Sequence, residues 1–262
     1  MTDPILYNAD FFTTYQGIKS ETVDLILTDP PYSIFKNEHS LSIAKNDPAI
    51  NLTKLEKAFD YLLKPNGSLL IFCNDNLLDR IKDNFITFEI WHKYFLIKSV
   101  AMPKGKTNPI NNVEYLISMK RKPVKPTEIY FNPYNGDIKK PYSKKNYKPD
   151  IPIRKMKKRS IDENKTGQRY LKTAINIQSK CNLPEKERSG HPFQKPEKVL
   201  RKMIKAYSRP GELIIDPFAG SASTLISAFK EKRNSIGYEI DSVFYEEASQ
   251  RINDNIKQLQ LF

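Results

Sequence analysis

The tetrapeptide Asp29-Pro30-Pro31-Tyr32 combines groups that can activate a weakly nucleophilic aromatic amine. The lone pair of such an amine is delocalised into its ring, and two acceptors for its N–H groups favour a localised lone pair. The Asp29 carboxylate and the Pro30 carbonyl can supply these acceptors, since the two prolines fix φ and remove competing donors. Tyr32 offers a flat face for a nucleobase extruded from a duplex. The alternative is an Asp-Pro turn that only caps the next segment.

A second Asp-Pro turn, Asp216-Pro217-Phe218-Ala219-Gly220-Ser221, has the character of a cofactor loop. Asp216 can accept from the methionine ammonium of AdoMet, and Gly220 permits a close backbone approach before a helix N-terminus. Glu239 ends the next predicted strand roughly 20 residues later, where an acid that binds ribose hydroxyls is expected. A dinucleotide site is the alternative, but its G-x-G-x-x-G pattern is absent. Glu239 as an ordinary surface carboxylate also stays open.

Both turns follow apolar runs within an alternation of short β-branched runs and helical patterns, which predicts a parallel α/β sheet. Ligands of such sheets collect at the carboxyl ends of strands, where the strand order switches. The predicted strands are Ile5–Ala9, Asp24–Thr28, Ser68–Cys73, Ile86–Ile97, Glu114–Met119, Leu213–Ile215 and Ser235–Glu239. The predicted helices are Lys54–Leu63, Asn76–Asp83, Pro196–Tyr207, Ala222–Lys230 and Ser242–Gln258.

The net charge of +13 is concentrated in residues 121–190, which hold 19 Lys/Arg and 7 Asp/Glu. This segment has no sustained helical or strand period. A solvated basic face or a disordered arm is one interpretation. Aromatic residues interleaved with the cations favour a polyanion surface with stacking groups, and therefore nucleic-acid binding. These aromatic residues are Tyr130, Phe131, Tyr134, Tyr142, Tyr147 and Tyr170.

The sequence does not indicate a membrane protein, a secreted protein or a zinc-binding protein. No apolar run approaches the ~20 residues that a membrane helix needs. The N-terminus lacks the basic flank and apolar run of a signal peptide. Cys73 and Cys181 are the two cysteines, and neither lies in a CxxC spacing. We therefore expect a reduced, cytoplasmic protein with no bound metal and no membrane partner.

Together and in this order, the motifs resemble the β-group of amino-DNA methyltransferases, in which the catalytic Asp-Pro-Pro-Tyr precedes the AdoMet loop. The resemblance covers nearly everything outside residues 121–190. It implies a circularly permuted, seven-stranded AdoMet-methyltransferase sheet (Rossmann-like α/β) with a loop-rich basic insertion. In that order the strands that end at Asp29 and Asp216 are neighbours. The implied division is 1–120 for the catalytic half of the core, 121–190 for target recognition and 191–262 for the AdoMet-binding half.

Two further segments are similar to the family's cofactor contacts. The run from His191 to Pro196 resembles His-Pro-x-Gln-Lys-Pro, which precedes a helix beside the methionine end of AdoMet. Here Gln194 and Lys195 are the implied contacts, and His191 is either a contact or a structural polar group. Residues 8–11 occupy the place of a turn that approaches the AdoMet adenine. The implied cofactor-binding residues are Asp10, Phe11, Gln194, Lys195, Asp216, Phe218, Gly220, Ser221 and Glu239.

The segments Trp91-x-Lys93 and Asn112-x-Glu114-Tyr115 resemble those near the family's target base, although Trp91 itself is expected in the core. The cofactor loop departs from the family at Ala222, where a glycine is usual. Because alanine disfavours a positive φ, AdoMet affinity would fall if that geometry is required. The family also tends to have Thr where Phe193 stands.

The resemblance implies direct transfer of a methyl group from AdoMet to adenine N6 in double-stranded DNA, with base flipping. Asp-Pro-Pro-Tyr rather than Ser-Pro-Pro-Tyr indicates adenine over N4 of cytosine, which is the alternative. Methylation of RNA or of a protein amide fits less well, since those enzymes usually read Asn-Pro-Pro-Tyr. A catalytically weak DNA-binding protein on a methyltransferase scaffold is a further alternative. A homodimer, a cognate restriction endonuclease and a bacterial or phage origin are all compatible with the sequence.

Overall fold

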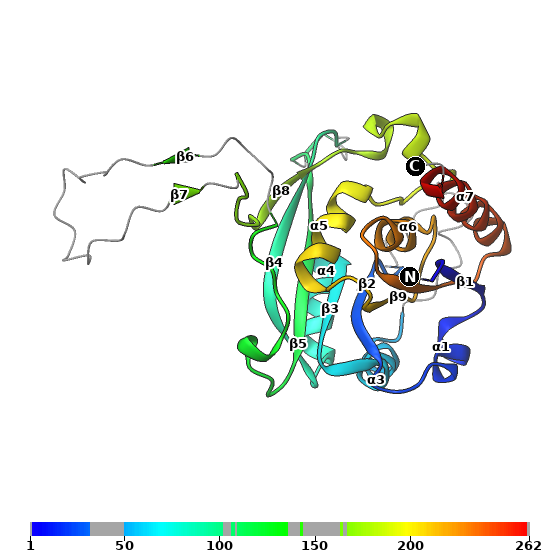
Figure 1. The fold of residues 1–262 in the computed structure, drawn as a ribbon. Helices are drawn as coiled ribbons and strands as arrows, with labels where there is room; N and C mark the ends of the chain where they lie inside the picture. Colours follow the sequence, from blue (N-terminus) through cyan, green and yellow to red (C-terminus); the bar gives the residue numbers. More distant parts are fainter. Residues whose placement is uncertain are drawn as a thin grey trace, which may run out of the picture.

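Eight strands form the main sheet of the computed structural model, in the order β1-β10-β9-β2-β3-β5-β4-β8 (Figure 1). Neighbouring strands are parallel, except that β5 runs antiparallel to both β3 and β4. The strands are β1 Ile5–Asn8, β2 Val23–Thr28, β3 Leu63–Cys73, β4 Phe88–Lys98, β5 Val113–Arg121, β8 Ala174–Ile177, β9 Leu213–Asp216 and β10 Asn234–Glu239. The structure describes residues 2–31, 50–101, 106–107, 109–135, 142–143, 163–164 and 167–260.

The strand order confirms the permuted connectivity that the resemblance implied, but the main sheet has eight strands and not the expected seven, because β8 adds to it beside β4. The first strand of the chain, β1, lies at one edge beside β10, the last strand. The chain then enters β2 in the middle of the sheet, where Leu25 pairs in parallel with Ile214 of β9. The strands that lead into Asp29 and end at Asp216 are therefore neighbours, as the resemblance implied.

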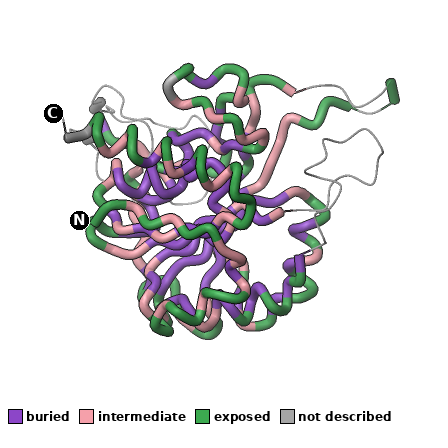
Figure 2. The backbone as a smooth tube through the Cα atoms, turned by 90° about the vertical axis from the view of Figure 1, so that its right-hand side faces the viewer, coloured by how far each residue is buried: buried purple, intermediate pink, exposed green. Residues whose placement is uncertain are grey.

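Helices cover both faces of the sheet, and Figure 2 shows the buried positions gathered along the strands and the inward sides of these helices. On one face, α1, α3 and α4 pack with β2, β3 and β5 in one apolar cluster. On the other, α5 packs on the same strands in a second cluster, and α6 packs against α7 in a third. These helices are α1 Phe11–Thr14, α3 Leu52–Leu62, α4 Asp75–Asn84, α5 Glu197–Tyr207, α6 Ser223–Lys230 and α7 Ser242–Gln260.

The local sequence explains where α3 and α4 begin. Asn51 and Asn74 act as N-caps, their side-chain oxygens accepting from the backbone N–H groups of Lys54 at 2.9 Å and Leu77 at 2.8 Å. Every predicted strand and helix has an observed counterpart with shifted bounds. The largest shift is in β3, which begins at Leu63, directly after α3. No helix in the described part of the chain is long and apolar enough to cross a membrane.

The segment from 121 to 190 divides into three parts. Residues 129–135 run along α5, where the Asn132 N–H donates to the Ala206 carbonyl at 2.8 Å and Phe131 packs against the second cluster. A small antiparallel pair, β6 Tyr142–Ser143 with β7 Glu163–Asn164, lies away from the main sheet (Figure 1). The chain then returns as β8, which the sequence did not predict, and extends the main sheet beside β4. Short 3₁₀ helices lie at Tyr15–Gly17, Pro126–Glu128, Lys180–Asn182 and Glu185–Glu187.

Candidate functional site

The adjacency of β2 and β9 brings two carboxylates to the same edge of the sheet. Asp29 follows the last residue of β2, and Asp216 is the last residue of β9. Burial raises the pKa of the Asp216 carboxyl and the charge of Asp29 adds to this rise, so the two groups interact electrostatically. Parallel strands of an α/β sheet expose their ligand sites at this edge. The sequence-predicted pair therefore lies in one site.

Asp29 forms an ion pair with a lysine from the loop before α5. The Lys195 ammonium lies 2.9 Å from Asp29 Oδ2, and the side chains are 13% and 21% exposed, respectively. Pro30 is buried, which anchors the turn directly after the carboxylate. Tyr32, the fourth residue of the predicted catalytic motif, lies outside the described residues. The described part of the motif thus presents a partly buried carboxylate whose geometry an ion pair restrains.

Lys195 also contacts Glu114 on β5, at 3.4 Å from Oε2. Glu114 forms a second ion pair with Lys98 of β4. Burial opposes ionisation of the Glu114 carboxyl, but Lys195 and Lys98 outweigh it, so its pKa lies below the ordinary value. The Lys195 ammonium also lies 5.1 Å from the centre of the Phe72 ring. A line of alternating charges thus crosses the strand ends from Asp29 to Lys98.

Beyond β3, aromatic side chains from β4 and β5 lie next to these charges. Tyr115 of β5 lies edge-on to Phe95 of β4, with ring centres 5.8 Å apart, and the Lys93 ammonium lies 4.0 Å above the Tyr115 ring. Cys73 faces the same region, and burial raises the pKa of its thiol to about 12. This thiol is therefore neutral near pH 7 and is no nucleophile there. Trp91, expected in the core, is partly buried and packs with Phe131 and Tyr207 against the second apolar cluster.

Asp216 has a different environment from Asp29. It is 3% exposed, and its Oδ1 accepts from the Phe218 N–H at 3.2 Å. Burial is the main cause that raises the pKa of its carboxyl to about 6. Among the described residues, no Lys or Arg forms an ion pair with it. Asp216 is thus a buried carboxylate near a second one, without a cationic ion-pair partner in the described part of the chain.

Glu239, at the end of β10, contacts the loop that follows Asp216. Glu239 accepts from the backbone N–H groups of Gly220 and Asp241, both at 2.9 Å, and burial raises the pKa of its carboxyl. Gly220 has a φ of +49°, and a Cβ built there would lie 3.0 Å from Nε2 of His191. Burial lowers the pKa of His191 to about 4, so this ring is neutral near pH 7. Both φ and the limited space therefore favour glycine at position 220.

Comparison with known sequences assigns the chain to a family. The family model described as DNA methylase, which covers N6 and N4 methyltransferases, matches residues 23–250. The chain belongs to the DNA methylase family. The type II methyltransferase M.HpaI of Haemophilus parainfluenzae is 24% identical, over 91% of this chain and 70% of its own length. The DNA adenine methyltransferase YhdJ of Escherichia coli (strain K12) is 29% identical, over 95% of this chain and 82% of its own.

Solved structures show the same fold. The complex of M1.HpyAVI with SAM matches the methylase with a TM-score of 0.63 at 24% identity, covering 95% of this chain and 99% of that one. The cytosine-N4-specific PvuII DNA methyltransferase matches with a TM-score of 0.66 at 15% identity, covering 98% and 93%. The methylase is an AdoMet-dependent DNA methyltransferase, with AdoMet as the methyl donor.

The residues at the β9 and β10 ends fit this cofactor. The buried carboxylate of Asp216, which has no Lys or Arg ion-pair partner among the described residues, suits an ammonium group. The space beside the Gly220 Cα is filled by the His191 ring. Glu239, on the neighbouring strand, presents a carboxylate at the distance along the chain expected for ribose hydroxyls. Beside them, Ser221 is buried, and its hydroxyl lies 3.0 Å from that of Ser223.

Other predicted cofactor residues of the methylase have structural partners in the described chain. Asp10 caps α1 by accepting from the Phe12 N–H at 2.8 Å. Phe11 is 2% exposed and packs edge-on against Phe218 and Tyr238. Phe12 and Phe218 are only partly buried, with ring centres 6.3 Å apart. The contacts of Asp10, Phe11 and Phe218 with AdoMet stay predictions.

Gln194 and Lys195, predicted together, face different ways. The Gln194 amide bonds within its own loop, its oxygen accepting from the N–H and hydroxyl of Ser189 and its nitrogen donating to the Glu187 carbonyl. Lys195 reaches Asp29 instead. Sequence reasoning missed this ion pair, and it missed Arg251 of α7, which donates to the Ser221 carbonyl of the cofactor loop. No local pattern marks either contact, because each joins segments far apart in the chain.

Proposed function

We propose that the chain methylates N6 of adenine in double-stranded DNA, using Asp29 and the Pro30 carbonyl as acceptors for the amine. The observation that carries this proposal is the position of the Asp29 carboxylate, restrained by Lys195 at 2.9 Å and next to the strand end of Asp216. Adenine N6 has two N–H groups, and the pair of acceptors matches them.

The protein residues provide position and polarity for the transfer. Asp29 accepts one N6–H and the Pro30 carbonyl the other, which localises the nitrogen lone pair toward the donor. AdoMet supplies an electrophilic methyl group on its sulfonium. As the methyl C–S bond breaks and the N–C bond forms, the positive charge passes to N6, which then releases one proton to solvent water, so the product amine is neutral. Tyr32 stacks on the extruded base. Holding both reactants in attacking geometry contributes about 7–11 kcal/mol.

The residues around β9 and β10 hold the donor in this proposal. The Asp216 carboxylate accepts from the ammonium, and Glu239 accepts from the ribose hydroxyls. The remaining assignments are those from the sequence: Asp10 and Phe11 near the adenine, Phe218 and the backbone at Gly220 and Ser221 in the loop, and Gln194 with Lys195 before α5. The loop position of Gln194 supports an indirect contribution, through the shape of the segment that carries Lys195.

Adenine is favoured over cytosine on two grounds. The relative from Escherichia coli, aligned over 95% of this chain, is named a DNA adenine methyltransferase. The motif also begins with Asp, which resembles the adenine-modifying members. Methylation of cytosine N4 is the outcome that would overturn this part of the proposal.

Residues 121–190 are the proposed target-recognition segment. The part between Asn135 and Gly167 holds eleven Lys/Arg and four Asp/Glu, which suits contact with DNA phosphates. The ends of this part are close together, since the rings of Tyr134 and Tyr170 lie 4.6 Å apart. A short Gly-Ser linker can therefore replace residues 136–166. We expect that protein to lose sequence-specific DNA binding and to keep AdoMet binding.

A homodimer and a cognate restriction endonuclease, as in systems with type II methyltransferases, are further parts of the proposal.

The deciding experiment uses purified protein, labelled AdoMet and DNA from a methylation-free host. Digestion to nucleosides and mass spectrometry should show N6-methyladenine, and single-molecule sequencing should place it in one sequence context. The Asp29→Ala protein should give neither signal. Full adenine methylation by that variant, or N4-methylcytosine as the product, would contradict the proposal.

A further inference from the structure

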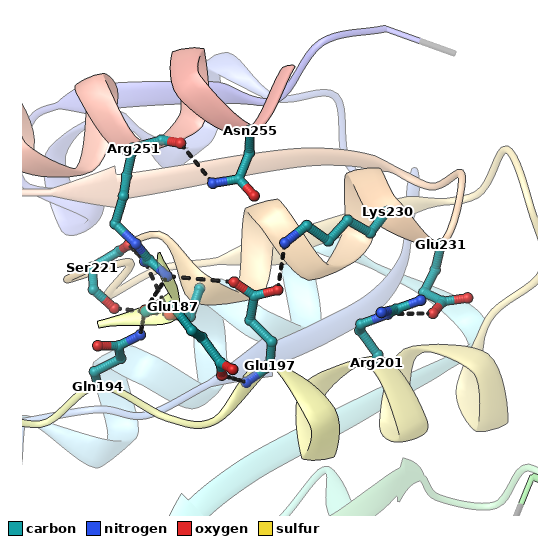
Figure 3. Close-up of polar contacts among 10 residues, drawn as sticks. Glu187, Gln194, Glu197, Arg201, Ser221, Lys230, Glu231, Arg251 and Asn255 are labelled. Atoms are coloured by element: carbon teal, nitrogen blue, oxygen red, sulfur yellow. Dashed lines mark hydrogen bonds and ion pairs between the residues drawn. The ribbon is translucent and has the colours of Figure 1, made fainter. Parts of the chain in front are cut away.

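Arg251 of α7 lies where three segments of the chain meet (Figure 3). Its guanidinium donates to the Ser221 carbonyl of the cofactor loop and to the Ser223 hydroxyl at 3.2 Å. It also donates to the Glu187 carbonyl at 3.0 Å and to Glu197 Oε1 at 3.4 Å. The side chain is 13% exposed. One partly buried cation thus bonds the cofactor loop, the loop before α5 and the first turn of α5.

The loop before α5 is organised around the same point. Glu187 Oε1 accepts from the Glu197 N–H at 2.7 Å, which caps a helix whose own N-cap, Pro196, has no side-chain donor or acceptor. The Glu187 carbonyl also accepts from Gln194. Lys195 lies between these two anchored positions. The position of its ammonium beside Asp29 therefore depends on how this loop is held.

The cofactor loop needs Arg251 for a different reason. Ala222 has a φ of +55°, and α6 begins after it without a side-chain cap. The first helical bond here runs from the Ile226 N–H to the Ala222 carbonyl at 3.0 Å, so the Ser221 carbonyl lies outside the ladder. A buried carbonyl requires a donor, and Arg251 provides it. The guanidinium thereby fixes the exit of the loop that begins at Asp216.

We propose that Arg251 is a positioning residue that couples the AdoMet loop to the Lys195–Asp29 pair. The inference rests on the proposed assignment of residues 216–221 to AdoMet. The two loops share one rigid, forked donor, so a displacement of either loop changes its bonds to the other. Binding at the AdoMet site and binding of the flipped base are then linked. Linkage is reciprocal, so AdoMet binding changes DNA affinity by the same factor that DNA binding changes AdoMet affinity.

The test compares Arg251→Lys with Arg201→Gln. Lysine keeps the charge beside Glu197 but cannot form the fork to both loops. Arg201 is the matched control, since it pairs with Glu231 at 2.6 Å, is 44% exposed and contacts neither loop (Figure 3). Calorimetry gives the Kd of S-adenosylhomocysteine. Fluorescence anisotropy gives the DNA Kd with and without saturating S-adenosylhomocysteine, and the ratio is the coupling factor.

In Arg251→Lys, we expect a roughly tenfold higher Kd for S-adenosylhomocysteine, a lower kcat and a coupling factor near one. Arg201→Gln should match the wild type in all three. A purely structural role would lower the melting temperature and leave the coupling factor unchanged, and that result would overturn the proposal. So would a wild-type coupling factor of one.

A second variant covers the case in which Arg251→Lys does not fold. Ser223→Ala removes one acceptor of Arg251 with little change in packing, and it should lower the coupling factor in the same direction. An unchanged factor in this variant would also count against the inference. Asp216→Asn separates the two proposals: if it binds S-adenosylhomocysteine as the wild type does, the cofactor assignment fails, whatever Arg251 shows.

Discussion

Two neighbouring strand ends each present a carboxylate, and the two carboxylates have opposite environments. Asp29, after β2, has a side chain that is 21% exposed and forms an ion pair with Lys195. Asp216, at the end of β9, is 3% exposed and, within the described chain, has no cationic side chain as an ion-pair partner. Burial and the charge of Asp29 both raise the pKa of Asp216. The same residue type thus occupies one neutralised and one unneutralised site.

This difference matches the charges of the two proposed ligands. A carboxylate that already has a cation can accept from a neutral amine without a large electrostatic change. A buried carboxylate without one carries a desolvation cost, which an incoming ammonium offsets. The edge of the sheet therefore separates a site for a neutral base from a site for a cationic cofactor end. Substitutions that exchange or remove these charges test this separation.

The largest effect is expected at Asp29. In Asp29→Asn, the side chain keeps its size but its amide can present a donor to the amine, so kcat should fall by about 10²–10⁴-fold. Because Asp29 lies at the proposed base site, the Kd of S-adenosylhomocysteine should change by less than about threefold. A tenfold change in Kd would correspond to about 1.4 kcal/mol of binding free energy. Single-turnover methylation and calorimetry measure the two quantities. A large loss of cofactor affinity with normal kcat would show that the two sites are not separate.

The next effect is expected at Asp216. Asp216→Asn removes the buried charge proposed to accept from the ammonium, and a hydrogen bond to a charged group contributes about 1.5–3 kcal/mol. The Kd of S-adenosylhomocysteine should rise by about 10–100-fold. At saturating AdoMet, kcat should fall far less than in Asp29→Asn. Equal losses of kcat in the two variants would contradict the assignment of different roles.

The pKa of Asp216 gives a pH dependence of cofactor binding. Burial raises this pKa from 3.8 to about 6, so the folded protein holds a proton between these values that the unfolded chain has lost. The stability contributed by protonation of Asp216 is therefore fully present below pH 3.8 and is lost as the pH rises through 6. Ammonium binding requires the ionised form, so cofactor affinity should fall by up to about tenfold per pH unit below 6.

Titration calorimetry with S-adenosylhomocysteine between pH 5 and 8 measures this dependence. Asp216→Asn is the control, and its weaker binding should vary much less with pH in the same range. If the variant kept the full dependence, another group would be responsible. Glu239, whose pKa is also raised by burial, is then the first to substitute.

Much of the site could be predicted because it depends on local signals. Asp-Pro turns after apolar runs mark strand ends, and strand ends of a parallel sheet lie at one edge. The resemblance added the permuted order, which makes β2 and β9 neighbours and brings Asp29 and Asp216 together. Glu114 and Tyr115 were also indicated by a motif, and the structure places Glu114 beside Lys195.

The missed features depend on contacts between distant segments. Strand β8 has four residues, two of them buried isoleucines, and is too short to show a reliable strand period in the sequence. Its parallel pairing with β4 is what makes this segment a strand. Gln194 and Lys195 are adjacent in one motif, yet the first bonds within its loop and the second reaches Asp29. Arg251 resembles any helical arginine in sequence. Only the fold shows that it bonds two loops.

The smallest effect is expected at Ala222, where the family usually has glycine. Its φ of +55° is strained for alanine, at a cost of about 1–2 kcal/mol. Its methyl group is fully buried in the cluster between α6 and α7, however, and burial of such a group contributes about 0.8 kcal/mol. Glycine also gives the unfolded chain more freedom. Ala222→Gly should therefore change the free energy of unfolding by less than about 1 kcal/mol, because these terms oppose one another.

Ala222 already adopts the left-handed conformation that glycine favours. The shape of the cofactor loop should therefore be unchanged in Ala222→Gly. The Kd of S-adenosylhomocysteine in Ala222→Gly should stay within about twofold of the wild type, a difference below 0.5 kcal/mol. Urea denaturation and calorimetry on the same samples measure both quantities. A tenfold tighter Kd would mean that alanine holds the loop away from its binding shape. Strain in the loop would then weaken the contribution of Asp216 to cofactor binding.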